Sequence, residues 1–140
     1  MAVHHALVGL LSIATGNRLG HSAIAGGRES FGYGLLEAVT ATTEHPERPV
    51  LLLHYDDPLP VSHQPVAGPQ EESLALILGL AGPTGTPGDV TLGLEPAGRD
   101  AAVSESLALD FLLFLLNGSR RGGAVGERMH WRWGRVDVPG

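Results

Sequence analysis

Two apolar runs restrict most strongly what this chain can fold into. Residues 50–55 (VLLLHY) and residues 73–81 (SLALILGLA) lack the alternation of polar and apolar side chains that marks a strand with one solvated face. Such a run is typical of a strand that is covered on both faces. We therefore expect residues 50–55 to form a central strand and residues 73–81 to form a second apolar strand.

Three segments show the periodicity of helices with an apolar face. Residues 3–14 repeat apolar side chains on one face, and the pattern returns in residues 28–43. A third helix is expected over residues 104–116, which are apolar nearly all round, so this helix is sandwiched or awaits a partner. The side chains of the second helix that we expect to face inward are Phe31, Leu35, Ala38 and Val39.

Shorter strands complete the predicted fold. Residues 22–25 are expected to be a short buried strand end, residues 89–95 a half-buried strand, and residues 129–136 an edge strand. No internal repeat and no second domain is visible, so residues 1–140 are expected to form a single domain. The order of helices and strands predicts a layered α/β fold.

Two glycines fall inside the second predicted helix. Gly32 and Gly34 each weaken a helix by about 1 kcal/mol relative to alanine. Small residues at these positions would allow another backbone to approach closely, and that is a reason for the chain to tolerate the cost.

The absence of two residue types excludes several kinds of chemistry. None of the 140 residues is a cysteine or a lysine, which excludes disulfides, thiolate metal sites, cysteine nucleophiles and Schiff-base lysines. The net charge of −6 argues against general nucleic-acid affinity, although five of the nine arginines follow Asn117, with only two acidic residues among them. No apolar run reaches the roughly 18 residues that span a bilayer, and no basic signal-peptide start is present. We therefore expect a soluble, cytoplasmic protein without a membrane span.

Seven histidines raise the question of a metal site. His4 and His5 are adjacent and point to different sides of the first predicted helix, so they do not serve one ion together. His45, His54 and His63 are nine residues apart, but they fall in a loop, a strand and another loop. No HExxH or HxH spacing occurs. We expect neither a metal nor a cofactor.

Acidic and hydroxyl side chains offer two further hypotheses. Asp56 and Asp57 follow the predicted central strand, where open α/β sheets often contact ligands, but Asp-Asp-Pro also favours a turn. Ser22 or Ser30 with a histidine base would make a hydrolase or transferase, although neither lies in a GxSxG motif.

Aromatic and basic residues alternate near the end of the sequence. Trp131, Arg132, Trp133 and Arg135 offer a surface that could stack on a nucleic acid or hold a phosphate. The same alternation is typical of a half-exposed strand, and a nucleic-acid footprint should extend further over a basic surface. We favour the strand and expect no nucleic-acid partner.

A corner at Ala25, Gly26 and Gly27 joins a short apolar run to the second predicted helix. Several enzyme families hold a nucleophile where a strand turns sharply into a helix. Here no serine or cysteine occupies the tip of the corner. Glycine in such a turn usually provides a positive φ, and spacing alone does not distinguish an elbow without its nucleophile from a plain turn.

Several motifs resemble the β-ketoacyl synthases of the thiolase-like superfamily. The segment VHHALVGLLSIATGNRLGHSAIAGGRESFGYGLLEA is similar to the region that leads into their active-site elbow. SIATGN, GRESF at residues 27–31, GLLEA at residues 34–38 and YDDPLP at residues 55–60 resemble the β-ketoacyl synthase-like N-terminal domains of aryl-polyene-type gene clusters. The resemblance covers most of residues 2–82, and the closing WRW also fits. It implies a thiolase-like half-domain, with buried helices and a mixed sheet.

Two departures from the family pattern bear on activity. The family's nucleophilic cysteine should fall between Ile24 and Gly27, with Gly26 the preferred position, and none of these residues is a nucleophile. The partner histidines of condensing enzymes lie in a C-terminal half that this chain lacks. The resemblance also begins almost at Met1, so the chain is expected to be shortened at its N-terminus or to have a start placed too late. If strands are missing, residues 50–55 and 104–116 should have exposed faces.

The resemblance implies a chain-length-factor-like subunit that does not catalyse condensation by itself. Such a subunit pairs with an active ketosynthase, and the substrate is an acyl chain on an acyl carrier protein bound at the partner's active site. The helix that begins at Arg28 and the strands beside it are expected at the interface, with Phe31 and Tyr33 near the acyl tunnel or the partner. The alternatives are the serine-dependent hydrolase or transferase and a truncated remnant without function.

Overall fold

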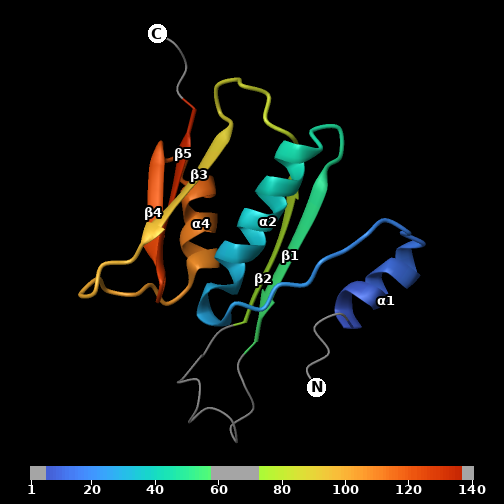
Figure 1. Ribbon diagram of the computed structural model, residues 1–140, viewed down its shortest axis with the longest axis horizontal. Helices are drawn as coiled ribbons and strands as arrows, with labels where there is room; N and C mark the ends of the chain where they lie inside the picture. Colours follow the sequence, from blue (N-terminus) through green and yellow to red (C-terminus); the bar gives the residue numbers. More distant parts are fainter. Residues whose placement is uncertain (1–5, 58–72, 137–140) are drawn as a thin grey trace, which may run out of the picture.

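The computed structural model describes residues 6–57 and 73–136 (Figure 1). The predicted layered α/β fold is confirmed. In chain order its elements are α1 (Ala6–Thr15), η1 (Gly27–Glu29), α2 (Ser30–Glu44), β1 (Val50–Asp56), β2 (Leu74–Leu80), β3 (Val90–Pro96), α4 (Leu107–Leu116), β4 (Arg121–Val125) and β5 (Met129–Arg135).

The described strands form two antiparallel sheets rather than one mixed sheet. β1 pairs with β2, and β5 lies between β3 and β4. α2 packs against β1 and β2, α4 packs against β4, and the two helices contact each other. Figure 1 shows both helices lying between the two sheets. No helix of the described part is long and apolar enough to cross a membrane.

The core lies where the two helices and both sheets meet. α2 directs Phe31, Leu35 and Ala38 into it, as the periodicity predicted, and Val39 is half-buried against it. From β5 of the three-stranded sheet, Trp131 is completely buried in this core, and Trp133 is only 4% exposed. The remaining buried core side chains are Leu76, Leu107, Ala108, Phe111, Phe114 and Ala124.

β1 is not a central strand, so that prediction is wrong. In the described residues it has one neighbour, β2, and α2 covers only one face of the pair. Side chains alternate along each strand, and the register places three cross-strand pairs on the uncovered face. We call this surface the ribbon face; it comprises Leu51, Leu53, Tyr55, Ala75, Ile77 and Gly79.

The ribbon face and α4 both carry exposed apolar side chains. Such exposed faces were expected on residues 50–55 and 104–116 if strands of the family fold are missing. On the ribbon face Tyr55 is 60% exposed and Ile77 is 67% exposed. On α4, the outward side chains Leu109, Leu113 and Leu116 follow one another at helical spacing and are exposed. Within residues 6–57 and 73–136, no layer covers these apolar side chains on their outer side.

α4 begins later than predicted. Ser106, not Ser104, is its N-cap, because the Ser106 hydroxyl oxygen accepts a hydrogen bond of 3.2 Å from the Leu109 N–H. Ser104 instead forms a short hydrogen bond to the Asp110 carboxylate. Both serines thus hold the first turn of the helix.

β5 is the centre of its sheet, so the predicted edge strand is wrong. Its second neighbour is β4, a strand of sequence RGGAV that was not predicted. Two glycines and a lack of alternation hide this strand from pattern analysis. Its pairing buries the two tryptophans of β5 on the helix side of the sheet.

The N-terminal helix forms, but it does not bury the face that the periodicity predicted. On the predicted face, Leu10 is 66% exposed, Leu11 is 37% exposed, and Ala14 is exposed as well. Figure 1 shows the helix lying away from the two sheets, joined to α2 by an extended segment. Residues 22–25 form no strand, contrary to prediction, because they pair with no neighbour in the described sheets.

The glycines of α2 make room for side chains rather than for another backbone. A Cβ added at Gly32 would lie 2.5 Å from Cε2 of Trp131, and one at Gly34 would lie 3.3 Å from Cδ1 of Leu52. The indole ring therefore rests directly on the helix at Gly32.

We predict that Gly32→Ala destabilises the protein despite the better helix propensity of alanine. The added methyl group would overlap the Trp131 ring, and such overpacking typically costs about 1–3 kcal/mol. Denaturant unfolding monitored by circular dichroism measures the change. Gly79→Ala is the matched control, because nothing lies within 4 Å of a Cβ there, and equal stability losses in both variants would contradict the prediction.

Candidate functional site

The corner at residues 25–27 leads directly into α2 through the short helix η1. Gly27 has a φ of +65°, so the expectation that glycine supplies a positive φ is confirmed there. Gly26 has a φ of −116°, but a Cβ on it would lie 2.7 Å from the Tyr33 ring. One glycine is thus required by backbone conformation and the other by space, and Ala25 beside them is exposed.

Ser30 holds the corner together. Its hydroxyl accepts a hydrogen bond of 2.9 Å from the Gly26 N–H and donates one of 2.7 Å to the Gly27 carbonyl oxygen. Both partners are backbone groups, and neither is a general base that would activate a nucleophile. Ser22, the other candidate nucleophile, is exposed in the segment before the corner.

Glu29 is a buried carboxylate at the base of the corner, and only 1% of it is exposed. It accepts hydrogen bonds from Nε and the backbone N–H of Arg128, from the Met129 N–H at 3.0 Å, and from Nε1 of Trp131 at 3.2 Å. The Arg128 guanidinium also donates to the Gly26 carbonyl at 3.2 Å. These bonds join the start of α2 to the β4–β5 turn, far away in the sequence.

The environment of Glu29 favours its charged form. Burial by itself would raise the pKa of Glu29, but hydrogen bonds from Arg128, Trp131 and Met129 outweigh it and hold the pKa below the ordinary value. Sequence reasoning missed this residue because its partners lie about one hundred positions away.

Phe31 and Tyr33, predicted near a tunnel or partner, lie on opposite sides of α2. Phe31 is 3% exposed and packs in the core, with its ring centroid 5.6 Å from that of Phe111. Tyr33 is half-buried beside the corner, edge-on to Trp131 at 5.2 Å, with the Arg128 guanidinium 5.4 Å from its ring centroid. Their role near a tunnel or partner stays a prediction.

The predicted polar candidates do not converge. His54 lies against Phe31 in β1, and burial lowers its pKa while the charge of Asp56 opposes the shift. His45 lies 3.7 Å from Glu47 on the surface, and Asp57 is exposed after β1. Within residues 6–57 and 73–136, no three potential metal ligands gather. His4, His5 and His63 lie outside the described residues.

The tryptophans of β5 are not available for stacking on a base. Trp131 and Trp133 point into the core, whereas Arg132 points outward and contacts Glu95 at 2.9 Å. The interpretation of this segment as a strand with alternating faces is confirmed.

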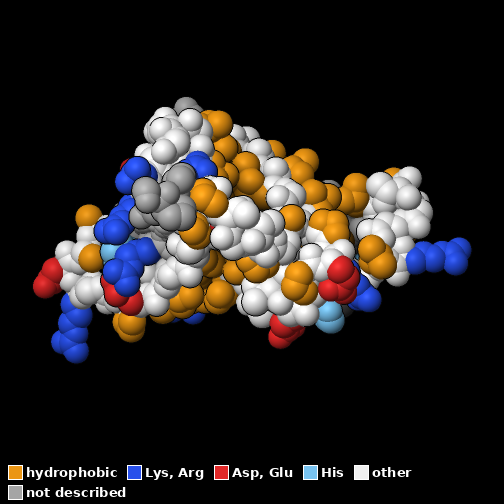
Figure 2. All heavy atoms as spheres, turned by 90° about the horizontal axis from the view of Figure 1, so that it is seen from above, with side chains coloured by type: hydrophobic (Ala, Val, Ile, Leu, Met, Phe, Trp, Pro, Cys, Tyr) orange, Lys and Arg blue, Asp and Glu red, His pale blue; other side chains and the backbone are white. Residues whose placement is uncertain are grey.

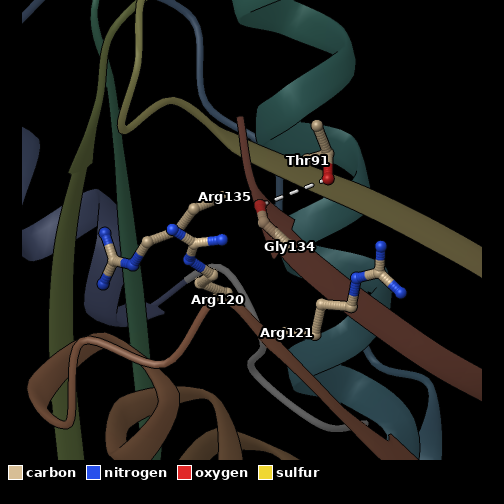
Figure 3. Close-up of a pocket in the computed structure, with 5 residues that line it drawn as sticks. All are labelled: Thr91, Arg120, Arg121, Gly134 and Arg135. Carbon is tan, nitrogen blue, oxygen red and sulfur yellow. Dashed lines mark hydrogen bonds between the residues drawn. The ribbon is translucent and has the colours of Figure 1, made fainter. Parts of the chain in front are cut away.

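A hollow of about 530 Å³ lies at the strand ends of the three-stranded sheet (Figure 3). The sequence pointed to it only through the excess of arginines after Asn117. Its lining residues are Thr91, Arg120, Arg121, Gly134 and Arg135.

Comparison with known proteins places the chain in a family. Residues 1–134 match the model of the β-ketoacyl synthase, N-terminal domain. The chain belongs to this family.

A solved structure agrees with the family and its fold. The chain is similar to a chain in the structure of the ketosynthase ApeO in complex with its chain length factor ApeC from Xenorhabdus doucetiae. The TM-score is 0.79 and the identity 27%, and the match covers 96% of this chain but only 55% of that one. The thiolase-like resemblance read from the sequence is thus confirmed. Among curated proteins no match was found.

We predict that Glu29→Gln destabilises the fold by about 2 kcal/mol or more. Glutamine has one acceptor oxygen and would place an NH₂ group against donors, so buried N–H groups would lose their partner. Glu37→Gln, an exposed change on the same helix, should alter the unfolding free energy by less than about 0.5 kcal/mol. Similar losses in both variants would rule out the anchoring role.

We also predict a specific loss of stability in acid. Because the folded pKa of Glu29 is lowered, its contribution is complete above the ordinary value of 4.5 and disappears as the pH falls through the folded pKa. The difference in unfolding free energy between wild type and Glu29→Gln should therefore shrink below pH 4.5. In NMR spectra, the indole N–H signal of Trp131 should move with this titration, while that of Trp133, which finds no acceptor among the described residues, should not. A constant difference down to pH 3 would contradict the assignment.

Proposed function

We propose that this protein is a non-catalytic β-ketoacyl synthase-like subunit that pairs with an active ketosynthase, as a chain length factor does. One observation carries the proposal. This member of the family has Ala25, Gly26 and Gly27 where the nucleophile is expected, and its sequence contains no cysteine. Without a thiolate, the chain cannot form the covalent acyl intermediate of a condensing enzyme. Residues 1–140 act as one domain in this proposal.

The corner supports the proposal because its groups serve the fold. The Ser30 hydroxyl is bonded to the turn, and the Glu29 carboxylate is bonded to the β4–β5 turn. The serine-dependent hydrolase has no comparable support, since no observed contact activates Ser30. We therefore prefer a structural subunit to an enzyme.

The ribbon face is the part of the chain that we assign to the ketosynthase partner. Apolar side chains from both strands line it, Leu51 is 58% exposed and Ile77 is 67% exposed. Contiguous exposed apolar surface of this kind is typical of protein interfaces. The interior face of α2 is occupied by the core of this chain, so the strands rather than the helix contact the partner.

In this proposal the chemistry takes place on the partner. The ketosynthase binds the acyl chain carried by an acyl carrier protein, and this chain shapes the space that the acyl group occupies, with Tyr33 beside the corner. The pathway is of the fatty-acid or polyketide type, in the aryl polyene branch that the YDDPLP and GRESF segments resemble, and it operates in the cytoplasm.

Co-expression with the ketosynthase encoded nearby tests the pairing. With a tag on this chain only, native mass spectrometry of the purified product should show one copy of each subunit. A folded chain that is recovered without the ketosynthase would reject the proposal.

A charged residue on the ribbon face tests where the partner binds. Ile77→Asp should reduce recovery of the ketosynthase at least about tenfold, because a carboxylate would be buried in an apolar interface. Ala101→Asp makes the same charge change at an exposed loop position and should leave recovery unchanged. Thermal unfolding of both variants shows that they fold. A complex that tolerates Ile77→Asp would move the interface elsewhere.

A further inference from the structure

The arginine hollow is formed by three strands and the turn before β4. Thr91 comes from β3, Arg120 from the turn before β4 and Arg121 from its start, and Gly134 and Arg135 come from the end of β5 (Figure 3). A second hollow of about 360 Å³ shares Thr91, Arg121 and Gly134 with the first. Its remaining lining residues are Leu92, Gly93, Gly122, Arg132 and Trp133. The two hollows therefore lie next to each other.

The charge of this surface is opposite to that of the whole chain. Three of the five residues that line the first hollow are arginines and none is acidic, whereas the chain carries a net charge of −6. Figure 2 shows arginine side chains gathered at the end of the molecule that holds this sheet. A local positive field on an acidic protein selects small anions rather than a nucleic acid with its extended charge.

One guanidinium group at the first hollow, that of Arg135, is held in position by contacts within the fold. Arg135 donates hydrogen bonds to the Leu115 carbonyl at 3.0 Å and the Ser119 carbonyl at 3.2 Å, and its guanidinium lies 5.2 Å from the Phe114 ring centroid. The Arg135 N–H donates to the Arg120 carbonyl at 2.9 Å, which holds the two residues next to each other. A guanidinium that is already held loses little conformational entropy when it binds an anion.

The side chain of Arg121 differs from its neighbours because it makes no hydrogen bond or ion pair with the described residues. It lies on the opposite side of Gly134 from Arg120 and Arg135 in Figure 3. Space between them is kept open by Gly134, where a Cβ would lie 3.2 Å from the Thr91 hydroxyl oxygen. That hydroxyl donates to the Gly134 carbonyl at 3.2 Å, which fixes the side chain at the wall of the hollow.

We propose that this hollow binds a phosphate group. Planar guanidinium groups match the oxygens of a phosphate in two-point hydrogen bonds, and several of them around one hollow favour a dianion over chloride. The phosphate is either free inorganic phosphate or the end of a phosphate ester whose organic part lies along the second hollow. The site does not depend on pairing with a ketosynthase, so it can be tested on this chain alone.

A titration of the protein with phosphate compounds, monitored by NMR, tests the proposal. Inorganic phosphate and glycerol 3-phosphate are added separately to the full chain at pH 7, with ionic strength held constant by sodium chloride. The amide signals of Thr91, Arg121 and Gly134 should shift saturably while those of α1 stay unchanged. Tighter binding of glycerol 3-phosphate identifies an ester as the ligand, and equal binding identifies the phosphate group alone. Shifts that do not saturate, or that spread over the whole chain, would overturn the proposal.

Charge-matched variants assign the binding to the hollow. Arg121→Gln should weaken binding at least about fivefold, because one charged donor pair is lost, and Arg121→Lys should retain part of it. Arg99→Gln removes the same charge from an exposed turn and should change the dissociation constant by less than about twofold. Thermal unfolding confirms that each variant is folded. Equal weakening by Arg121→Gln and Arg99→Gln would reduce the effect to net charge and reject the site.

Discussion

The buried carboxylate of Glu29 is the interaction on which the arrangement of the protein depends. It accepts hydrogen bonds from Arg128, Met129 and Trp131, so one side chain at the start of α2 fixes the turn between β4 and β5. A buried charge without such partners is strongly unfavourable, and the α2 corner therefore forms correctly only when the three-stranded sheet is in place. Gly32 completes this junction, because the Trp131 ring rests on the helix where a larger residue would exclude it.

The position of the helices between two separate sheets explains the uneven burial. Each sheet has one face against the helices, so the core is continuous through α2 and α4 while the ribbon face and one stripe of α4 are exposed. Strands with apolar side chains on both faces normally have a covering layer on each side. The exposed surface is thus a consequence of the apolar runs, and it supplies the partner contact in the proposed function.

The corner is held in shape by backbone conformation and by hydrogen bonds. Gly27 provides the positive φ, Ser30 closes the turn, and Glu29 anchors it, all without a nucleophilic side chain at the tip. These interactions stabilise the junction of α2 with the rest of the fold.

The sequence by itself determined the helix over α2 with its buried face, the existence of β1, β2 and β3, and the absence of any thiol chemistry. Each follows from a local period or from composition, which need no knowledge of distant residues. Only the tertiary structure decided that Glu29 is an anchor, that β5 is central and that Arg121 and Arg135 border one hollow, because their neighbours lie far along the chain. The glycine-rich β4 escaped prediction for a related physical reason: its pairing with β5, rather than side-chain alternation, makes it a strand.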